Sequence, residues 1–213
     1  VPRNVFVVTF DDGYANFFTQ AYPVLKALEI PATLFLPTAY LDSDQPFPFD
    51  DWEAAGDERV LSQTWLPLST DQCQEMLDSG WIELGAHTHT HQDFRDRPEE
   101  FAVDLQHCLD VLRDRFQLVN PSFAFPYGSP ERGFAAESLV QEVQKIGLRC
   151  ALTTERKLVR PQESPFHWGR FAAFQNDTAN MLAARLNGWD EALRHFARVT
   201  TSGQKSVRGI WGK

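Results

Sequence analysis

The sequence predicts an α/β protein built around a parallel sheet, and two observations point to it. Short apolar runs alternate along the chain with segments whose apolar residues recur at helical spacing, as in strands joined by crossover helices. The first run, Val5–Phe10, carries no polar alternation, so we expect a strand buried on both faces. Periodicity alone leaves open whether the sheet closes into a barrel.

The remaining strands are expected wherever a short apolar or β-branched run lies between turn residues. In chain order the predicted strands are Val5–Phe10, Ala32–Leu36, Trp81–Ala86, Ser122–Phe125, Arg149–Thr153 and Phe166–Ala172. Asp12-Gly13 follows the first strand as a turn, because glycine leaves φ free there.

The predicted helices connect these strands and begin at residue types that cap helix N-termini, such as Asn16 and Thr178. In chain order they cover Asn16 to Leu28, Asp71 to Ser79 behind Ser69-Thr70, Pro98 to Phe116, Phe134 to Ile146, and Thr178 to Val199 with a break at Gly188. Gly80 and Gly147 are placed to end helices, and the tail from Thr200 is expected to be loose.

Residues 39–68 interrupt the alternation, so we predict an insertion or lid there. Acidic residues mix in it with Phe47, Phe49, Trp52 and Trp65. Excursions of this length are usually functional or disordered. Aromatic side chains beside acids suit stacking on sugar rings, and a lid packed on its own aromatic residues explains the same composition.

Composition predicts one globular domain over residues 1–213. The net charge of -9 argues against a nucleic-acid partner, and no apolar run approaches the roughly 18 residues of a membrane span. Cys73, Cys108 and Cys150 are far apart, which favours buried thiols over a disulfide framework. The chain begins at Val1 without a signal peptide, so we expect that an N-terminal segment has been removed.

Polar clusters follow the first, third and fourth strands directly. They are Asp11-Asp12, His87-Thr88-His89-Thr90-His91 and Pro126-Tyr127-Gly128. The carboxyl ends of parallel strands form the ligand-binding edge of such proteins, so we expect the three clusters to meet there.

The histidines predict a metal site. His87 and His91 share a face whether the segment is extended or coiled, whereas His89 joins them only if it is extended. With a carboxylate from the first strand they form a ligand set with open positions, which suits catalytic zinc or another divalent ion. Such an ion supports hydrolysis, with the second carboxylate as the base that takes the proton of water.

These residues resemble a known family. Thr9-Phe10-Asp11-Asp12-Gly13, the His87–His91 segment and Phe125-Pro126-Tyr127-Gly128 are similar to the first three motifs of the polysaccharide deacetylases, the NodB-homology group or carbohydrate esterase family 4. The resemblance covers roughly Val5 to Pro130 and is nearest the members that process exopolysaccharide or poly-N-acetylglucosamine.

The resemblance implies a distorted (β/α)7 barrel, similar to a TIM barrel, and hydrolysis of N-acetyl groups on an amino-sugar polymer or oligosaccharide. It implies Asp11 as general base and Asp12, His87 and His91 as ligands of one divalent metal ion, zinc with cobalt, nickel or iron as alternatives. His89 becomes a bystander. The Tyr127 backbone N–H is expected to stabilise the oxyanion, and Pro126 to contact substrate.

Three departures from the family pattern lead to further hypotheses. Ala124 occupies the position of an arginine that orients the base in many members, and we expect Arg170 to supply that charge to Asp11. The tryptophan motif of the acetyl pocket is absent, which leaves Trp168 as the nearest candidate. The late Leu-x-His motif is absent too, because His195 lies in a predicted helix, and His167 is another candidate for the general acid.

Several alternatives remain beside the metal-dependent deacetylase. They are a catalytically silent carbohydrate-binding module that keeps the metal, another amidase or O-deacetylase of the superfamily, and an interaction protein that uses the acidic residues 42–58. A serine nucleophile is poorly supported, since no G-x-S-x-G elbow occurs. Family substrates favour the cell envelope or secretion, while the free cysteines leave a cytoplasmic location open.

Overall fold

The structure is a computed structural model, and it describes residues 5–50 and 62–189. Its sheet is parallel throughout, with strand order β1-β2-β3-β4-β5. The strands are β1 Val8–Phe10, β2 Ala32–Leu36, β3 Ile82–Ala86, β4 Phe123–Ala124 and β5 Ala151–Leu152. The predicted α/β class with a parallel sheet is therefore confirmed.

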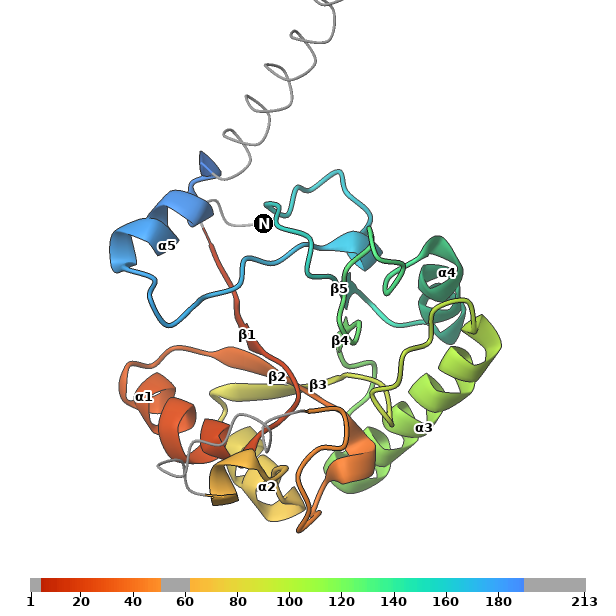
Figure 1. Cartoon of the computed structure of the whole chain (residues 1–213). Coiled ribbons are helices and arrows are strands. Elements are labelled where there is room, and N and C mark those ends of the chain that lie inside the picture. Colours follow the sequence, from red (N-terminus) through yellow and green to blue (C-terminus); the bar gives the residue numbers. More distant parts are fainter. Residues whose placement is uncertain (1–4, 51–61, 190–213) are drawn as a thin grey trace, which may run out of the picture.

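The sequential strand order explains the curvature of the sheet. Each strand pairs with the next strand along the chain, and crossovers between parallel strands are right-handed. The crossover helices therefore lie on one face of the sheet, and the sheet curls around its other face. Figure 1 shows this half-barrel with α1, α2, α3 and α4 outside it. The full count of seven strand–helix units stays a prediction.

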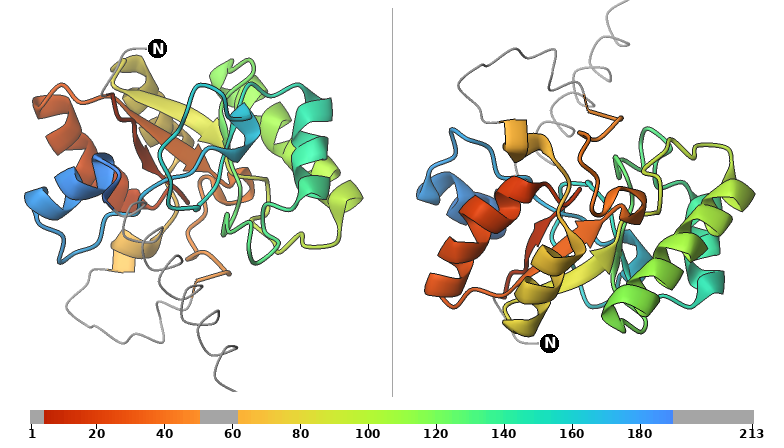
Figure 2. Two further views of the ribbon diagram at one scale, coloured as in Figure 1. Left: turned by 90° about the horizontal axis from the view of Figure 1, so that it is seen from above. Right: turned by 90° about the horizontal axis from the view of Figure 1, so that it is seen from below.

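The helices agree with the predictions most closely in the middle of the chain. They are α1 Tyr22–Ala27, α2 Thr70–Asp78, α3 Pro98–Phe116, α4 Glu137–Ile146 and α5 Ala179–Leu186. Ser69 and Gln72 form a reciprocal capping box at the start of α2, and Gly147 ends α4 with φ of 89°. Helix α5 lies on the β1 side of the sheet, away from α3 and α4 (Figure 2).

The expectation of a fully buried first strand was wrong. Val5, Phe6 and Val7 are 63%, 62% and 72% exposed, and β1 begins only at Val8. Within the described residues β1 pairs with β2 alone, so one of its edges lacks a neighbouring strand. The buried strand is instead β2, all of whose residues are buried.

Two other elements also differ from the predictions. The sixth strand is absent from the described residues: Pro165–His167 forms a 3₁₀ turn, and Trp168 makes a single parallel bridge to Leu152. Pro165 favours this outcome, because its fixed φ suits the first turn of a helix. Asn16 forms no side-chain cap, and the first helix opens with a π-helical turn, Phe17–Ala21. The stretch from residue 190 to Val199 lies outside the described residues.

The core fills the space between the curled sheet and its outer helices. Helix α3 contributes most to it, through Phe101, Leu105, Cys108, Leu112 and Phe116. Cys73 and Cys108 are buried free thiols and Cys150 is partly buried, as expected. No helix in the described part of the chain is long and apolar enough to cross a membrane.

The described start of the insertion packs on itself and on the carboxyl edge of the sheet. The ring centroids of Tyr40 and Phe47 are 5.4 Å apart, and those of Phe47 and Phe49 are 5.0 Å apart. Trp52 lies outside the described residues. Aromatic packing within the described part of the insertion is thus present.

Candidate active site

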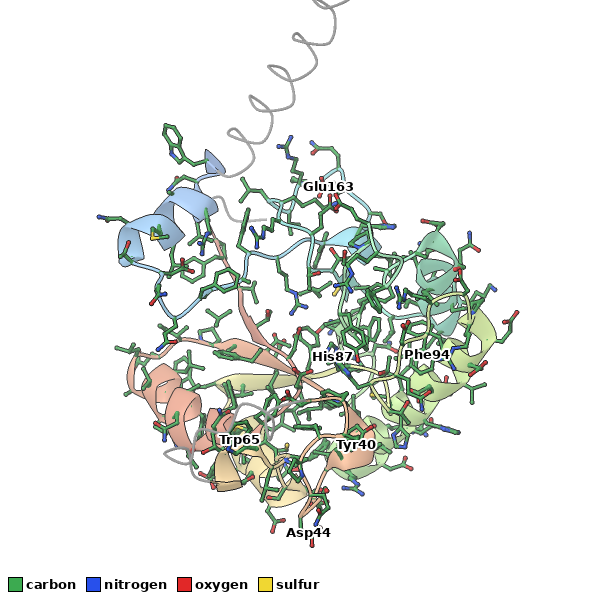
Figure 3. All side chains as sticks on the ribbon, viewed as in Figure 1. Tyr40, Asp44, Trp65, His87, Phe94 and Glu163 are labelled. Atoms are coloured by element: carbon green, nitrogen blue, oxygen red, sulfur yellow. The ribbon has the colours of Figure 1, made fainter. Side chains whose placement is uncertain are left out.

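The predicted clusters lie at the carboxyl ends of strands β1, β3 and β4 of one sheet. Asp11 follows β1, His87 follows β3, and Pro126 begins two residues after β4. Figure 3 shows His87 near the centre of the half-barrel, inside the ring of helices. The expectation that these segments share one edge of the sheet is therefore confirmed.

The turn after β1 directs its two acids to different partners. Asp12 and Gly13 both have positive φ, 72° and 73°, so the chain turns one residue earlier than the glycine alone predicts. A side chain at Gly13 would also come within 2.6 Å of Leu36, which excludes larger residues. As a result Asp12 faces the two histidines and Asp11 faces Arg170.

Asp12, His87 and His91 form a cluster with metal-binding geometry. The Oδ1 atom of Asp12 lies 3.4 Å from Nε2 of His87 and 3.3 Å from Nε2 of His91. A tetrahedral zinc ion with bonds of about 2.0–2.1 Å separates its ligand atoms by about 3.3–3.4 Å. The donor set and its spacing therefore fit zinc. Among the described residues this is the only such group of three.

The ring of His87 is oriented by the backbone of the neighbouring strand. Its Nδ1 lies 2.7 Å from the carbonyl oxygen of Ala124, which is the partner that a donated N–H requires. With the proton on Nδ1, the Nε2 lone pair is free to bind metal, the usual arrangement in metal-binding histidines.

The ring of His91 lies between two aromatic side chains. It stacks on Phe49 at a centroid distance of 4.0 Å and meets Tyr127 edge-on at 4.9 Å. Its buried Nδ1 has no hydrogen-bond partner among the described residues. The ring is therefore held by these aromatic contacts and by the approach of its Nε2 to Asp12, and the insertion contributes through Phe49.

The charges in the cluster act on one another. Burial alone raises the pKa of Asp12, but hydrogen bonds from His87 and His91 outweigh it and hold this pKa below its usual range. Burial lowers the pKa of His87, yet the charge of Asp11 and the contact with Asp12 dominate and raise it. Burial dominates at His91 and lowers its pKa.

His89 points away from the cluster. The segment is coiled, since Thr88 and His91 have φ of 64° and 54°, and coiling was the condition under which His89 turns away. Its Nδ1 lies 2.9 Å from the hydroxyl of Thr38, and its ring meets His107 edge-on. The described cluster therefore has two histidines and one carboxylate.

Asp11 is held by Arg170, as the hypothesis about the missing arginine requires. The two guanidinium nitrogens Nη1 and Nη2 donate to Oδ1 and Oδ2 of Asp11 at 2.7 and 2.8 Å. The same guanidinium donates to the Thr9 hydroxyl and to the Thr153 carbonyl, each at 3.2 Å. Arg170 is thus tied to two segments, the end of β1 and the residue after β5, and presents a fixed, paired charge to Asp11.

The remaining predicted residues lie around the cluster with different exposure. Tyr127 is 44% exposed with φ of 60°, and no hydrogen bond within the described chain uses its backbone N–H. Pro126 is buried beneath the turn, where it shapes the loop. Trp168 is partly buried beside β5, and its backbone bonds to Ala151 and Thr153.

Of the two candidates for the general acid, the structure describes only His167. His167 faces Glu137 at 3.5 Å, and His195 lies outside the described residues. Phe49 and Asp104 were not predicted as site residues, although Phe49 was noted as an insertion aromatic. Asp104 could have been found as an acid between Phe101 and Cys108 on the buried stripe of α3.

Comparisons with known proteins agree with this geometry. Residues 1–151 match the family model described as polysaccharide deacetylase. A poly-beta-1,6-N-acetyl-D-glucosamine N-deacetylase of Staphylococcus epidermidis is 25% identical over 199 residues, which cover 89% of this chain and 61% of that protein. The enzyme of the same name from Escherichia coli K12 is 26% identical over 198 residues, covering 76% and 27%. The chain thus spans 61% or less of these two relatives.

Solved structures have the same fold. IcaB from Ammonifex degensii superposes with a TM-score of 0.66 at 25% identity, covering 84% of this chain and 72% of that one. The deacetylase PplD of Streptococcus pyogenes, solved in complex with acetate, gives a TM-score of 0.67 at 19% identity, covering 84% and 69%. At 19% identity, the similarity to PplD supports the fold alone.

Proposed function

Because the chain belongs to the polysaccharide deacetylase family, as its motifs predicted, we propose that it removes N-acetyl groups from an amino-sugar polysaccharide or oligosaccharide with the help of one divalent metal ion. The observation that carries the proposal is the pairing of two sites at one edge of the sheet. Asp12, His87 and His91 offer a metal site, and Asp11 beside it is fixed by Arg170. A binding module that only keeps a metal has no need of the second acid.

Asp12 and Asp11 have different roles in the proposed reaction. An ion held by Asp12, His87 and His91, most suitably zinc, supplies Lewis-acid polarisation of the acyl carbonyl and of the attacking water. Asp11 accepts the proton of that water. Arg170 keeps the Asp11 carboxylate in one orientation through both oxygens, which supports a fixed path for the proton.

The charge that develops on the acyl oxygen needs a donor. The Tyr127 N–H suits this role, since no other described group accepts its hydrogen bond. The leaving amine needs a proton, and Asp11, protonated in the first step, is the acid that the described site offers. The residues therefore suffice for an amide hydrolysis in which one carboxylate serves first as base and then as acid.

The substrate class follows from the relatives. Both curated relatives above are named for poly-beta-1,6-N-acetyl-D-glucosamine, so we propose a β-1,6-linked N-acetylglucosamine chain as substrate. A polymer of this kind favours a place at the cell envelope or outside the cell. The insertion aromatic Phe49, partly exposed beside His91, supports a sugar-binding surface at this point.

The test is acetate release from β-1,6-linked N-acetylglucosamine oligomers by metal-stripped protein, before and after one equivalent of zinc. We expect release only after zinc is added, with slower release from β-1,4-linked oligomers. Zinc binding without release from any acetylated sugar would instead support the silent module. Absence of zinc binding would overturn the proposed chemistry altogether.

A further inference from the structure

The loop that carries both histidine ligands is hydrogen-bonded from helix α3 by one side chain. Asp104 accepts from the His89 N–H at 2.6 Å and from the Thr90 N–H at 3.2 Å through the same oxygen, Oδ1. Its second oxygen, Oδ2, accepts from the Thr90 hydroxyl at 2.6 Å. One carboxylate thus holds two consecutive residues that lie between His87 and His91.

The loop needs such a restraint because its backbone is strained. Thr88, a β-branched residue, has φ of 64°, and His91 has φ of 54°. These conformations are unfavourable for residues with a Cβ atom and persist where the surroundings enforce them. The His91 N–H donates to the Thr88 hydroxyl at 3.1 Å, which closes the turn but does not connect it to the rest of the protein.

Hydrogen bonds to His89 and Thr90 connect the loop to the rest of the protein. On the side opposite to Asp104, the Tyr40 hydroxyl donates to the Thr90 carbonyl at 2.8 Å, and the Ala39 N–H donates to the His89 carbonyl at 2.9 Å. Figure 3 labels Tyr40 on the segment below His87. The loop therefore lies between α3 and the start of the insertion, with Thr90 bonded to both.

Asp104 has no competing partner that would explain its presence. It lies well inside α3, seven residues after Arg97, so it does not cap that helix. Within the described residues no lysine or arginine forms an ion pair with it. Its charge is satisfied by the loop alone, and hydrogen bonds to a carboxylate are about twice as strong as neutral ones.

We propose that Asp104 is a positioning residue for the metal site: through Thr90 it holds His91 where its Nε2 faces Asp12. Helix α3 suits this task, because Phe101, Leu105 and Cys108 anchor it in the core on both sides of Asp104. The proposal rests on the metal site of the proposed function and adds to it a residue that contacts neither metal nor substrate.

The test measures zinc affinity by competition with a chromophoric chelator, in the wild type and in five variants. Loss of outer hydrogen bonds around a metal ligand typically costs about 10-fold to 100-fold in affinity, and we expect a loss of that size in Asp104→Ala. Thr90→Val removes only the hydroxyl at constant shape, so we expect a smaller loss. Thr90→Ser keeps the hydroxyl and should bind zinc with an affinity close to that of the wild type. Asp104→Asn keeps one acceptor oxygen but loses the charge, so its affinity should lie between those of Asp104→Ala and the wild type.

The matched control is Asp110→Ala, an acid on the same helix that pairs with Gln106 and Arg113 at the surface; its zinc affinity should not change. If Asp104→Ala fails to fold, the Thr90→Val and Thr90→Ser pair decides the question. Unchanged affinity in the folded Asp104→Ala and Thr90→Val proteins overturns this inference alone. A wild type that binds no zinc overturns the proposed function and the inference with it.

Discussion

Arg170 and Asp11 form a two-point ion pair across 159 residues of sequence, with distances of 2.7 and 2.8 Å. Both side chains are largely enclosed, at 16% and 28% exposure, so solvent screens the pair only in part. The arginine that many family members carry before the third motif is Ala124 here, a fully buried residue whose carbonyl orients His87. In this chain the guanidinium beside Asp11 comes instead from Arg170, two residues after the bridge between Trp168 and Leu152.

Arg170→Ala should lower kcat about 100-fold, the cost of a small misplacement of a catalytic group. KM and zinc affinity should change little, because Arg170 contacts neither Asp12 nor the histidines. Arg170→Lys should recover only part of the rate, since an ammonium group cannot make the two parallel bonds of a guanidinium. Steady-state kinetics on N-acetylglucosamine oligomers gives both parameters.

The control for that variant is Arg185→Ala. Arg185 forms a comparable two-point pair with Asp177 at the start of α5, away from the cluster. Its loss should affect the free energy of unfolding and leave kcat unchanged. Turnover of Arg170→Ala equal to that of the wild type would show that the Asp11 pair is merely structural.

Asp11→Asn and Asp12→Asn should separate the two acids. Asp11→Asn removes the base and should reduce kcat about 10²-fold to 10⁴-fold, with zinc still bound at one equivalent. Asp12→Asn replaces a charged ligand by a neutral one and should weaken zinc binding itself. Acetate release and zinc content, measured on the same preparations, distinguish these results, and equal zinc loss in both variants would contradict the assignment.

The sequence predicted the parts of this structure that rest on local pattern. The bounds of α3 and β2 follow from a buried stripe and an uninterrupted apolar run, and both agree with the structure. Val5–Val7 has an apolar pattern too, but its burial depends on which strand lies beside β1, and that is not encoded in the run. Pro165 likewise made a turn where the apolar pattern alone indicated a strand.

The site was predictable where residue type and spacing specify the chemistry. His87, His91 and the Asp11-Asp12 pair stand out because such groups rarely follow buried strands. Asp104 does not stand out in this way, because its role depends on a three-dimensional contact between α3 and the loop from His87 to His91. Its place on the buried stripe of α3 marks the acid in the sequence, but the sequence does not show which N–H groups donate to it.

Zinc affinity should fall as the pH is lowered, beginning above the ordinary histidine pKa of about 6.5. The reason is that Asp11 and Asp12, outweighing burial, raise the pKa of His87, and a protonated Nε2 cannot bind metal. In metal-free protein the pH dependence has the opposite sign. Protonated His87 stabilises the fold at low pH, and this contribution to the free energy of unfolding is lost as the pH rises through the raised pKa of His87. The rise in Tm caused by zinc should therefore grow as the pH rises through the range in which His87 loses its proton.

Thermal unfolding with and without zinc, at several pH values, measures this effect. His167→Gln is a suitable control, because His167 pairs with Glu137 and not with the cluster, and its profile should match that of the wild type. A zinc-induced shift that is independent of pH would mean that neither histidine is a ligand.

Phe49→Ala should raise KM for N-acetylglucosamine oligomers about fivefold to tenfold, equivalent to about 1–1.4 kcal/mol of lost aromatic contact. Phe49 stacks on His91 at 4.0 Å and is partly exposed, so it packs on the proposed metal ligand and still has surface open to substrate. Phe49→Trp should keep KM near that of the wild type. Phe174→Ala, a change at an aromatic residue of similar size that is 55% exposed elsewhere, should have no effect. If KM is unchanged and zinc affinity falls in Phe49→Ala, then Phe49 only supports the ring of His91. The contact with sugar must in that case come from other residues.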